Sequence, residues 1–255
     1  MSLKEYHPFD CDVEETGAYQ YSTGERYSSI VANARLVDLA IEAIDWTGQR
    51  VLDVGCGDGV FTMELFRRGK LSHITGIDLS SNAITAATAR VRNADATFAV
   101  CSGAQLPFDR DSFDVVQFRG VLHHMDDPRL AIAEALRVAR RVIILEPNGW
   151  NPVLKCIEKL SPYHRQHHEQ SYFSTRINEW VESQGGTVAR KKWAGLVPFF
   201  CPTGLAKVFK AIEPVIESIP VLRQFSCGTY VAVAERVDSI RIPTTVRDVR
   251  ESRAA

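Results

Sequence analysis

Residues 51–59 read VLDVGCGDG, and this stretch decides the fold of the chain. An apolar run with one acidic residue, Asp53, leads into a loop that has glycine at every second position, at Gly55, Gly57 and Gly59. Glycine lacks a Cβ atom, so the backbone can turn sharply there and a ligand can approach it closely. A helical pattern follows at once, and its first N–H groups would face such a ligand. The stretch therefore predicts a strand, a cofactor-binding loop and a helix.

The spacing of the glycines distinguishes between two kinds of cofactor. The dinucleotide fingerprint is G-x-G-x-x-G, in which a cradle of N–H groups holds a pyrophosphate. Here the pattern is one residue shorter, and Asp53 beside the loop would repel a pyrophosphate but suits a ligand with an ammonium group. A nicotinamide dehydrogenase therefore fits less well than a protein whose cofactor has no phosphate. A tight turn that binds nothing is the plain alternative.

Strands and helices alternate around this stretch. The first 150 residues predict five strands, at 49–54, 73–78, 96–101, 113–118 and 141–145, with a helix at 26–45 before them and helices between them. The predicted helix starts are Asp58, Ser80 or Ser81, and Asp127 followed by Pro128. This alternation predicts an α/β fold, a parallel sheet with helices on both faces. Further along we expect helices at 153–160, at 174–183 capped by Ser174, and within 195–225, and strands at 187–193 and 228–235.

The composition is that of an ordinary globular protein. The chain has 255 residues, of which 45% are hydrophobic and 24% charged. A net charge of -1 gives no electrostatic footprint for nucleic acid or an acidic membrane. No apolar run approaches the length of a membrane-spanning helix, and six scattered cysteines without a C-x-x-C pair indicate reduced thiols. We therefore expect a cytoplasmic protein without a nucleic-acid or membrane partner; its oligomeric state is left open.

Two motifs resemble those of a known family. The shortened glycine pattern with its acidic residue is similar to the first motif of class I S-adenosylmethionine-dependent methyltransferases. Residues 111–125, DSFDVVQFRGVLHHM, are similar to the fourth-strand region of the branch that acts on small molecules. The resemblance covers residues 48–147 well and 172–235 loosely. It implies a Rossmann-like, doubly wound sheet of seven strands, mostly parallel, with an antiparallel last strand beside the fifth, and S-adenosylmethionine as cofactor.

The resemblance also implies which residues hold the cofactor. Asp78 ends the second strand, where its carboxylate can accept from both ribose hydroxyls; the alternative is that it caps the next helix. Residues 101–108, CSGAQLPF, resemble a segment that usually reads D-A-x-x-L-P-F and meets the adenine, but this chain has Ser102 and Gly103 in place of its Asp and Ala. Arg119 is expected to meet the cofactor's carboxylate. The predicted cofactor-binding residues are Asp53, Gly55, Cys56, Gly57, Gly59, Asp78, Leu79, Ser102, Gly103, Ala104, Arg119 and Gly120.

The acceptor side offers candidates for catalysis. His123 and His124 follow the fourth strand, beside the expected methyl donor, and a histidine can take a proton from a hydroxyl during transfer. The alternative is that one of them caps a helix or packs under the sheet. Tyr27, Glu146 and Asn148 are the predicted substrate contacts, although Glu146 also reads as a solvated strand-end acid. The run of His164, His167, His168 and Glu169 reads as a solvated loop, so no metal site is predicted.

These expectations combine into one domain and one favoured reaction. Residues 1–235 form a single methyltransferase domain, divided into an N-terminal lid and helix (1–47), a cofactor-binding core (48–147) and acceptor-side helices with a lid (148–225); residues 236–255 form a tail. The favoured reaction is methyl transfer to a small molecule, with oxygen as the preferred acceptor atom. The alternatives are a protein that binds the cofactor without turnover, or an enzyme that methylates tRNA or protein.

Overall fold

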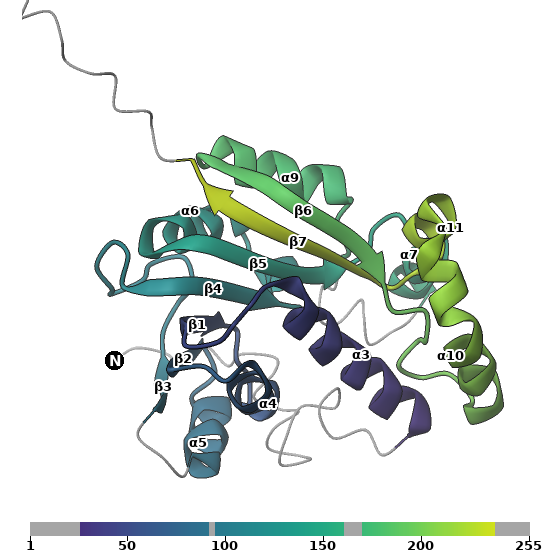
Figure 1. Ribbon diagram of the computed structural model, residues 1–255, viewed down its shortest axis with the longest axis horizontal. Helices are drawn as coiled ribbons and strands as arrows, with labels where there is room; N and C mark the ends of the chain where they lie inside the picture. Colours follow the sequence, from purple (N-terminus) through teal and green to yellow (C-terminus); the bar gives the residue numbers. More distant parts are fainter. Residues whose placement is uncertain (1–25, 92–94, 161–169, 238–255) are drawn as a thin grey trace, which may run out of the picture.

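A single seven-stranded sheet runs through the molecule. The computed structural model describes residues 26–91, 95–160 and 170–237. The strands follow the order β3-β2-β1-β4-β5-β7-β6 (Figure 1). β1 to β5 pair in parallel, and β7 runs antiparallel to both β5 and β6. The predicted sheet, with its antiparallel last strand beside the fifth, is confirmed. Its strands are β1 (Arg50–Val54), β2 (His73–Asp78), β3 (Ala96–Val100), β4 (Phe113–Arg119), β5 (Ala139–Pro147), β6 (Gly186–Ala194) and β7 (Thr229–Arg236).

Helices cover both faces of the sheet. On one face, α3 and α4 pack against apolar side chains of β1, β2, β4, β5 and β7; on the other, α6 and α9 pack against the opposite sides of these strands. This is the doubly wound arrangement that the alternation predicts. None of the described helices is long and apolar enough to cross a membrane. The helices are α3 (Tyr27–Ala43), α4 (Val60–Gly69), α5 (Ser81–Arg90), the short 3-10 helix η1 (Leu122–His124), α6 (Pro128–Val138), α7 (Pro152–Leu160), α9 (Ser174–Ser183), α10 (Thr203–Ser218) and α11 (Pro220–Ser226).

Two of the predicted helix starts are confirmed and two are wrong. The Ser80 hydroxyl accepts from Ala83 N at the start of α5, and Asp127 caps α6 with Pro128 in its first turn. Asp58 is not the N-cap of α4, because the loop continues for one more residue, to Gly59, whose φ is 77°. Ser174 is not the N-cap of α9. It is already the first helical residue, and its hydroxyl accepts from the indole N–H of Trp150 instead.

The strand order places the expected ligand site. β1 pairs with β2 on one side and with β4 on the other, so the loops that follow β1 and β4 lead to opposite faces of the sheet. Parallel sheets bind ligands in the crevice beyond the carboxyl ends of the strands at such a point. The glycine loop after β1 and the Arg119–His124 segment after β4 both lie there. The fold therefore brings the two motifs to one end of the sheet.

The loop requires glycine at its first position. Gly55 has a φ of 75°, and a Cβ atom there would lie 2.4 Å from Val121 Cγ2. Gly185 is a matched control, because its φ is 80° and no described atom lies within 4 Å of the added Cβ. We expect each alanine variant to lose about 1 kcal/mol for the left-handed backbone, and Gly55→Ala to lose about 1–3 kcal/mol more through overpacking. Denaturant unfolding of both variants measures the difference; equal losses would contradict the contact with Val121.

Candidate cofactor and acceptor site

Backbone hydrogen bonds attach the glycine loop to the neighbouring strand β2. Gly55 N and Cys56 N both donate to the carbonyl oxygen of Ile77, at 2.8 and 3.0 Å. Gly57 N donates to Asp78 Oδ2 at 3.0 Å. The loop and the end of β2 therefore hold each other in place, and predicted cofactor-binding residues from both segments lie together.

Asp78 occupies the position predicted for a ribose-binding carboxylate. Its Oδ1 accepts from Ser80 N at 2.9 Å, while Oδ2 accepts from Gly57 N. It does not cap α5, because the Ser80 hydroxyl takes that role, so the alternative reading of Asp78 is wrong. Leu79, beside it, exposes 55% of its surface. An aspartate at a strand end with an exposed apolar neighbour is suited to a nucleoside, which has a polar sugar and an apolar base.

Asp53 lies deeper than the ligand crevice. Its Oδ2 accepts from the Thr62 hydroxyl at 2.5 Å, and its Oδ1 accepts from Gln117 Nε2 at 3.2 Å. Burial raises the pKa of this carboxyl, and the two hydrogen bonds work against that rise. Asp53 thus joins β1, α4 and β4 beneath the loop, and its direct contact with the cofactor's ammonium group stays a prediction.

Arg119 places a guanidinium at the end of β4. It stacks over the ring of Phe61 at 3.5 Å, and its Nη2 lies 3.4 Å from Asn33 Oδ1. Burial lowers the pKa of Arg119 to about 10, while the charges of Asp53 and Asp58 act in the opposite direction. Its buried Nε has no hydrogen-bond partner among the described residues. A guanidinium held in this way has donor capacity for a carboxylate.

The loop after β3 packs closely on β1. A Cβ atom on Gly103 would lie 2.6 Å from Val54 Cγ1, so only glycine fits there without a shift. The Ser102 hydroxyl accepts from Ala104 N at 3.2 Å, within the same turn. Ser102 and Gly103, which replace the usual D-A sequence, therefore stabilise this turn and its packing on β1. The contact of this segment with an adenine stays a prediction.

His123 and Glu146 form a close pair between the ends of β4 and β5. His123 Nδ1 lies 2.7 Å from Glu146 Oε2. The other oxygen, Oε1, accepts from Val121 N and Leu122 N, both at 2.9 Å. Glu146 is only 1% exposed, so it is not the solvated strand-end acid of the alternative reading. It lies against the histidine, and the His124 ring is tilted by 46° against that of His123, with 3.9 Å between centroids.

The other two predicted substrate residues make contacts within the protein. Asn148 is fully buried, and its Nδ2 donates to the carbonyl oxygens of Gln224 and Cys227, at 2.7 and 2.9 Å. It therefore ties the end of β5 to the end of α11. Tyr27 begins α3 and packs against the cluster of Val197, Cys201 and Ala206. Substrate contact by these two residues stays a prediction.

Sequence reasoning missed two residues beneath the site. Thr62 and Gln117 hold the two oxygens of Asp53, and both are almost fully buried. Gln117 had a detectable signal, because it is a polar residue within the apolar run of β4; Thr62 had none. The run of His164, His167, His168 and Glu169 lies outside the described residues.

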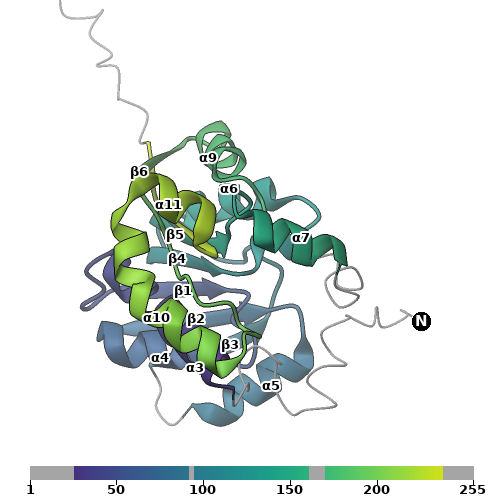
Figure 2. The same cartoon turned by 90° about the vertical axis from the view of Figure 1, so that its right-hand side faces the viewer.

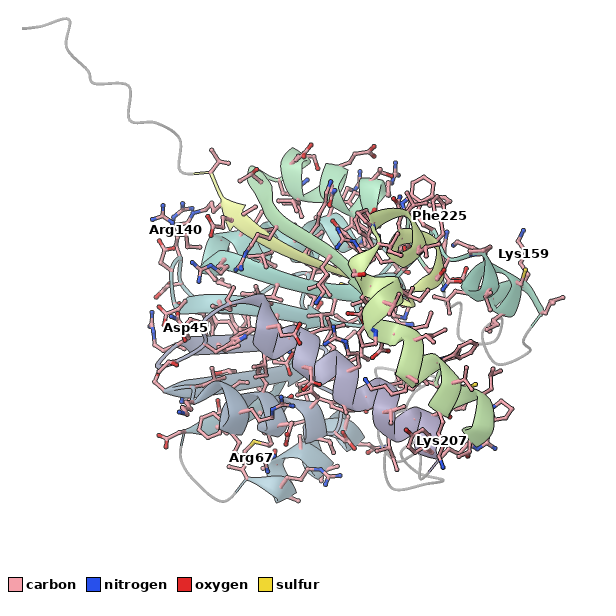
Figure 3. All side chains as sticks on the ribbon, turned by 45° about the vertical axis from the view of Figure 1, so that its right-hand side comes forward. Asp45, Arg67, Arg140, Lys159, Lys207 and Phe225 are labelled. Atoms are coloured by element: carbon pink, nitrogen blue, oxygen red, sulfur yellow. The ribbon has the colours of Figure 1, made fainter. Side chains whose placement is uncertain are left out.

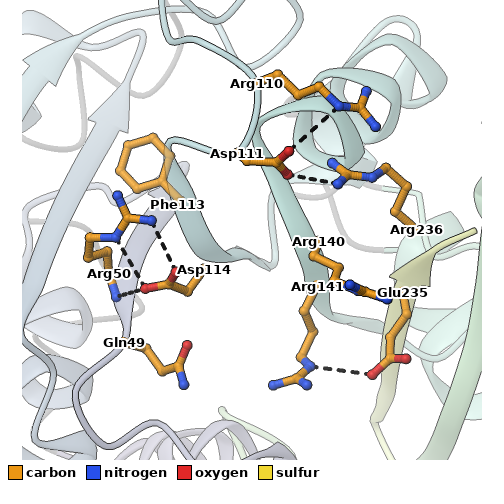
Figure 4. A pocket seen from close by; sticks show the side chains of 10 residues that line it. All are labelled: Gln49, Arg50, Arg110, Asp111, Phe113, Asp114, Arg140, Arg141, Glu235 and Arg236. Atoms are coloured by element: carbon orange, nitrogen blue, oxygen red, sulfur yellow. Dashed lines mark hydrogen bonds and ion pairs between the residues drawn. The ribbon is translucent and has the colours of Figure 1, made fainter. Parts of the chain in front are cut away.

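A cavity of about 800 Å³ lies at the opposite end of the sheet. Arginines and carboxylates line it, and Figure 4 shows that most of them are paired with one another. Arg50 pairs with Asp114, and Arg141 with Glu235. Asp111 pairs with both Arg110 and Arg236. These contacts describe a network of ion pairs at the amino ends of the parallel strands, away from the glycine loop.

The chain also matches known proteins in this region. Residues 52–144, from β1 into β5, match the family described as "Methyltransferase domain". This part of the chain is similar to class I S-adenosylmethionine-dependent methyltransferases. The chain is 33% identical over 119 residues to a ubiquinone biosynthesis O-methyltransferase of Hahella chejuensis. The aligned region covers 42% of this chain and 46% of that relative. The chain thus spans about half the length of this curated methyltransferase.

Solved methyltransferase structures share the fold over most of the chain. One is a complex of the Haloferax volcanii Trm112 methyltransferase activator with a methyltransferase, with a TM-score of 0.67 and 20% identity over 93% of this chain and 100% of the other. Another is the magnesium protoporphyrin IX methyltransferase of Synechocystis with bound S-adenosylhomocysteine. Its TM-score is 0.61, with 20% identity over 91% of this chain and 96% of that chain. At these identities the likeness shows the fold alone.

The described residues fit S-adenosylmethionine, the cofactor of this methyltransferase family. Arg119 Nε is a buried donor without a described partner, which suits the carboxylate of the cofactor's amino-acid end. Gly120 has a φ of 63°, and a Cβ atom there would meet only His123 Cε1, at 3.9 Å, among the described atoms. The backbone of Gly120 is therefore open to a ligand on this side. We assign the ribose to Asp78 and the amino-acid end to Arg119 and Gly120 as a prediction.

Proposed function

We propose that this chain transfers a methyl group from S-adenosylmethionine to a hydroxyl oxygen of a small molecule, with His123 as the general base. The observation that carries this proposal is the 2.7 Å contact between His123 Nδ1 and Glu146 Oε2. A histidine held by a carboxylate through one ring nitrogen is a recurrent arrangement in enzymes that remove a proton from a hydroxyl. Here the pair lies at the carboxyl ends of β4 and β5, at the same end of the sheet as the glycine loop.

The geometry defines a role for each member of the pair. Val121 N and Leu122 N hold Glu146 Oε1, so the carboxylate is fixed before any ligand binds. When Glu146 accepts the Nδ1 proton, the neutral imidazole carries its lone pair on Nε2. When bound, the cofactor supplies an electrophilic methyl group. As the acceptor oxygen forms its bond to that methyl carbon and the methyl–sulfur bond breaks, His123 Nε2 takes the hydroxyl proton.

A small-molecule acceptor is supported by the relative and by the sequence. The Hahella chejuensis relative is named as an O-methyltransferase, although the chain covers only 46% of it. The N-P-P-Y or D-P-P-Y signature that would indicate methylation of an amino group on a base is absent from the sequence. Oxygen is also the acceptor atom for which a histidine base is most useful, because a hydroxyl must lose its proton as it is methylated.

A product assay tests this proposal. The purified chain is incubated with S-adenosylmethionine that carries an isotope-labelled methyl group and with a panel of phenols, aliphatic alcohols, amines and thiols. Mass spectrometry is expected to find the label on oxygen in at least one product, together with S-adenosylhomocysteine. Label on nitrogen or sulfur alone would contradict oxygen transfer. Binding of S-adenosylhomocysteine without any product across the panel would favour a protein that holds the cofactor without turnover.

A further inference from the structure

The helix α10 turns its two carboxylates toward the interior and several large apolar side chains toward solvent. Its two carboxylates, Glu213 and Glu217, are 5% and 10% exposed and face the interior. Glu217 Oε2 lies 2.5 Å from Arg35 Nη2 of α3, and backbone N–H groups of Gly195 and Leu196 donate to the two carboxylates. Helices at the surface of globular proteins normally bury an apolar side and expose a charged one.

The outward side of α10 is an apolar stripe. Its side chains recur at alternating steps of three and four residues, so they share one side of the helix. Between 41% and 60% of their surface is exposed, and they are Leu205, Val208, Ile212 and Val215. The stripe continues beyond α10 through Ile219, Val221, Leu222 and Phe225, all at least 40% exposed. A contiguous apolar surface of this kind marks a site of association.

The neighbouring helix α7 extends this surface. It has no buried residue, and Val153 and Leu160 are 59% and 76% exposed. α7 packs against α11, and α11 against α10. Figure 2 shows the three helices together at the front of the molecule. We call the outward side of α7, α10 and α11 the helical face.

Cations dominate the charge of the helical face. Its three helices contain only three carboxylates, and these are turned inward, with side-chain exposures of 15%, 5% and 10% for Glu158, Glu213 and Glu217. Lys159 and Lys207 are exposed, and Figure 3 shows them with Phe225 along the same side of the molecule. We predicted no membrane footprint from the net charge of -1. That net charge is a sum over the whole chain and does not show that cations gather on one face.

A cationic groove lies at the edge of the helical face. It has a volume of about 450 Å³ between α3, α11, β6 and β7. Arg190, Lys191 and Lys192 of β6 line it together with Arg223 of α11, against one lining carboxylate, Glu42. Lys192 pairs with Glu42 and Glu217, and the lining cations outnumber the one lining carboxylate.

We propose that the helical face docks on the surface of an anionic lipid bilayer. Amphipathic helices bind such surfaces when apolar side chains enter the headgroup region and cations remain beside the lipid phosphates. The apolar stripe of α10 matches the first requirement, and exposed lysines beside it, Lys207 on α10 and Lys159 on α7, match the second. A second copy of this chain is the less suitable occupant, because a two-fold dimer places the same patch on both sides and would bring like cations together.

Vesicle co-sedimentation tests the proposal on the full chain. Vesicles of phosphatidylcholine mixed with phosphatidylglycerol are expected to bind the protein, and vesicles of phosphatidylcholine alone to bind it several-fold less. Val208→Asp is expected to weaken binding about tenfold or more, because it puts a charge in the centre of the apolar stripe. Lys207→Glu is expected to weaken binding about fivefold or more, because each cation near an anionic surface contributes about that factor. Added salt should weaken binding in the same direction.

The control variants make the same kinds of substitution at exposed residues outside the helical face. Leu130→Asp changes another exposed apolar side chain, on α6, and Arg67→Glu reverses an exposed cation on α4. Both should bind vesicles as the unmodified chain does. Equal binding by Val208→Asp and Leu130→Asp, or no binding to anionic vesicles, would overturn the proposal. A dimer in light scattering that Val208→Asp dissociates would overturn it in favour of a second copy. Circular dichroism checks that each variant is folded.

Discussion

Asp78→Ala is expected to weaken the binding of S-adenosylhomocysteine by about a hundredfold or more, because two charge-assisted hydrogen bonds to ribose contribute about 3 kcal/mol or more. Asp78 ends β2 with its carboxylate beside the glycine loop. The same carboxylate accepts from Gly57 N and Ser80 N, so its loss also loosens the loop. Both effects act in the same direction. Isothermal titration calorimetry of the variant against the unmodified chain measures the change.

A second substitution separates these two effects. Asp78→Asn keeps an oxygen that can accept from Gly57 N but removes the charge. Its affinity for S-adenosylhomocysteine is therefore expected to lie between those of Asp78→Ala and the unmodified chain. Asp114→Ala is the control, because Asp114 pairs with Arg50 at the other end of the sheet. It should bind S-adenosylhomocysteine normally. An affinity of Asp78→Ala close to that of Asp114→Ala would remove Asp78 from the cofactor site.

His123→Asn is expected to lower kcat by about 10²–10⁴-fold, the usual contribution of a general base. The variant removes the ring nitrogen that takes the proton and leaves the glycine loop and Asp78 unchanged. The affinity for S-adenosylhomocysteine should therefore stay near that of the unmodified chain. The unmodified enzyme should show a rate that rises with pH as its base loses a proton, and this rise should disappear in the variant. Steady-state kinetics with the acceptor found in the product assay, over a range of pH, measures both.

Glu146→Gln tests whether the carboxylate orients the base. The amide oxygen of glutamine can still accept from Val121 N and Leu122 N, but its NH₂ group would then face His123 Nδ1. The imidazole would have to accept there and carry its proton on Nε2, where it cannot act as a base. We expect a loss of kcat similar to that of His123→Asn. His73→Asn, at the start of β2, is the control. If Glu146→Gln kept more than about a tenth of the rate, well above the range for loss of a general base, the pair would have no catalytic role.

The fold could be predicted in large part because its signals are local. The glycines at 55, 57 and 59 and the alternation of strands and helices indicate the parallel core directly. The antiparallel direction of β7 came only from the family resemblance, because strand periodicity is the same in both directions. The wrong N-cap at Ser174 is also a case where a residue distant in sequence decides, because the indole N–H of Trp150 donates to the Ser174 hydroxyl. The wrong N-cap at Asp58 is a local error of one residue.

The site was predicted less completely, since side-chain partners come from distant segments. Asp78 could be placed because strand ends meet at one edge of a parallel sheet. Glu146 also ends a strand, yet its environment depends on Val121, Leu122 and His123, which belong to another loop. Asn148 likewise binds carbonyl groups at the end of α11. No pattern within residues 139–148 indicates that these two polar side chains are buried.

Val121 belongs to both halves of the site. Its side chain lies where a Cβ atom of Gly55 would be, and its backbone N–H holds Glu146, which in turn contacts His123. A displacement of the glycine loop by a bulky cofactor analogue would push on Val121 and carry through Glu146 to the imidazole. Redesign of this protein for alkyl donors larger than methyl therefore has to enlarge the crevice elsewhere, because a displaced glycine loop would disturb the alignment of the base.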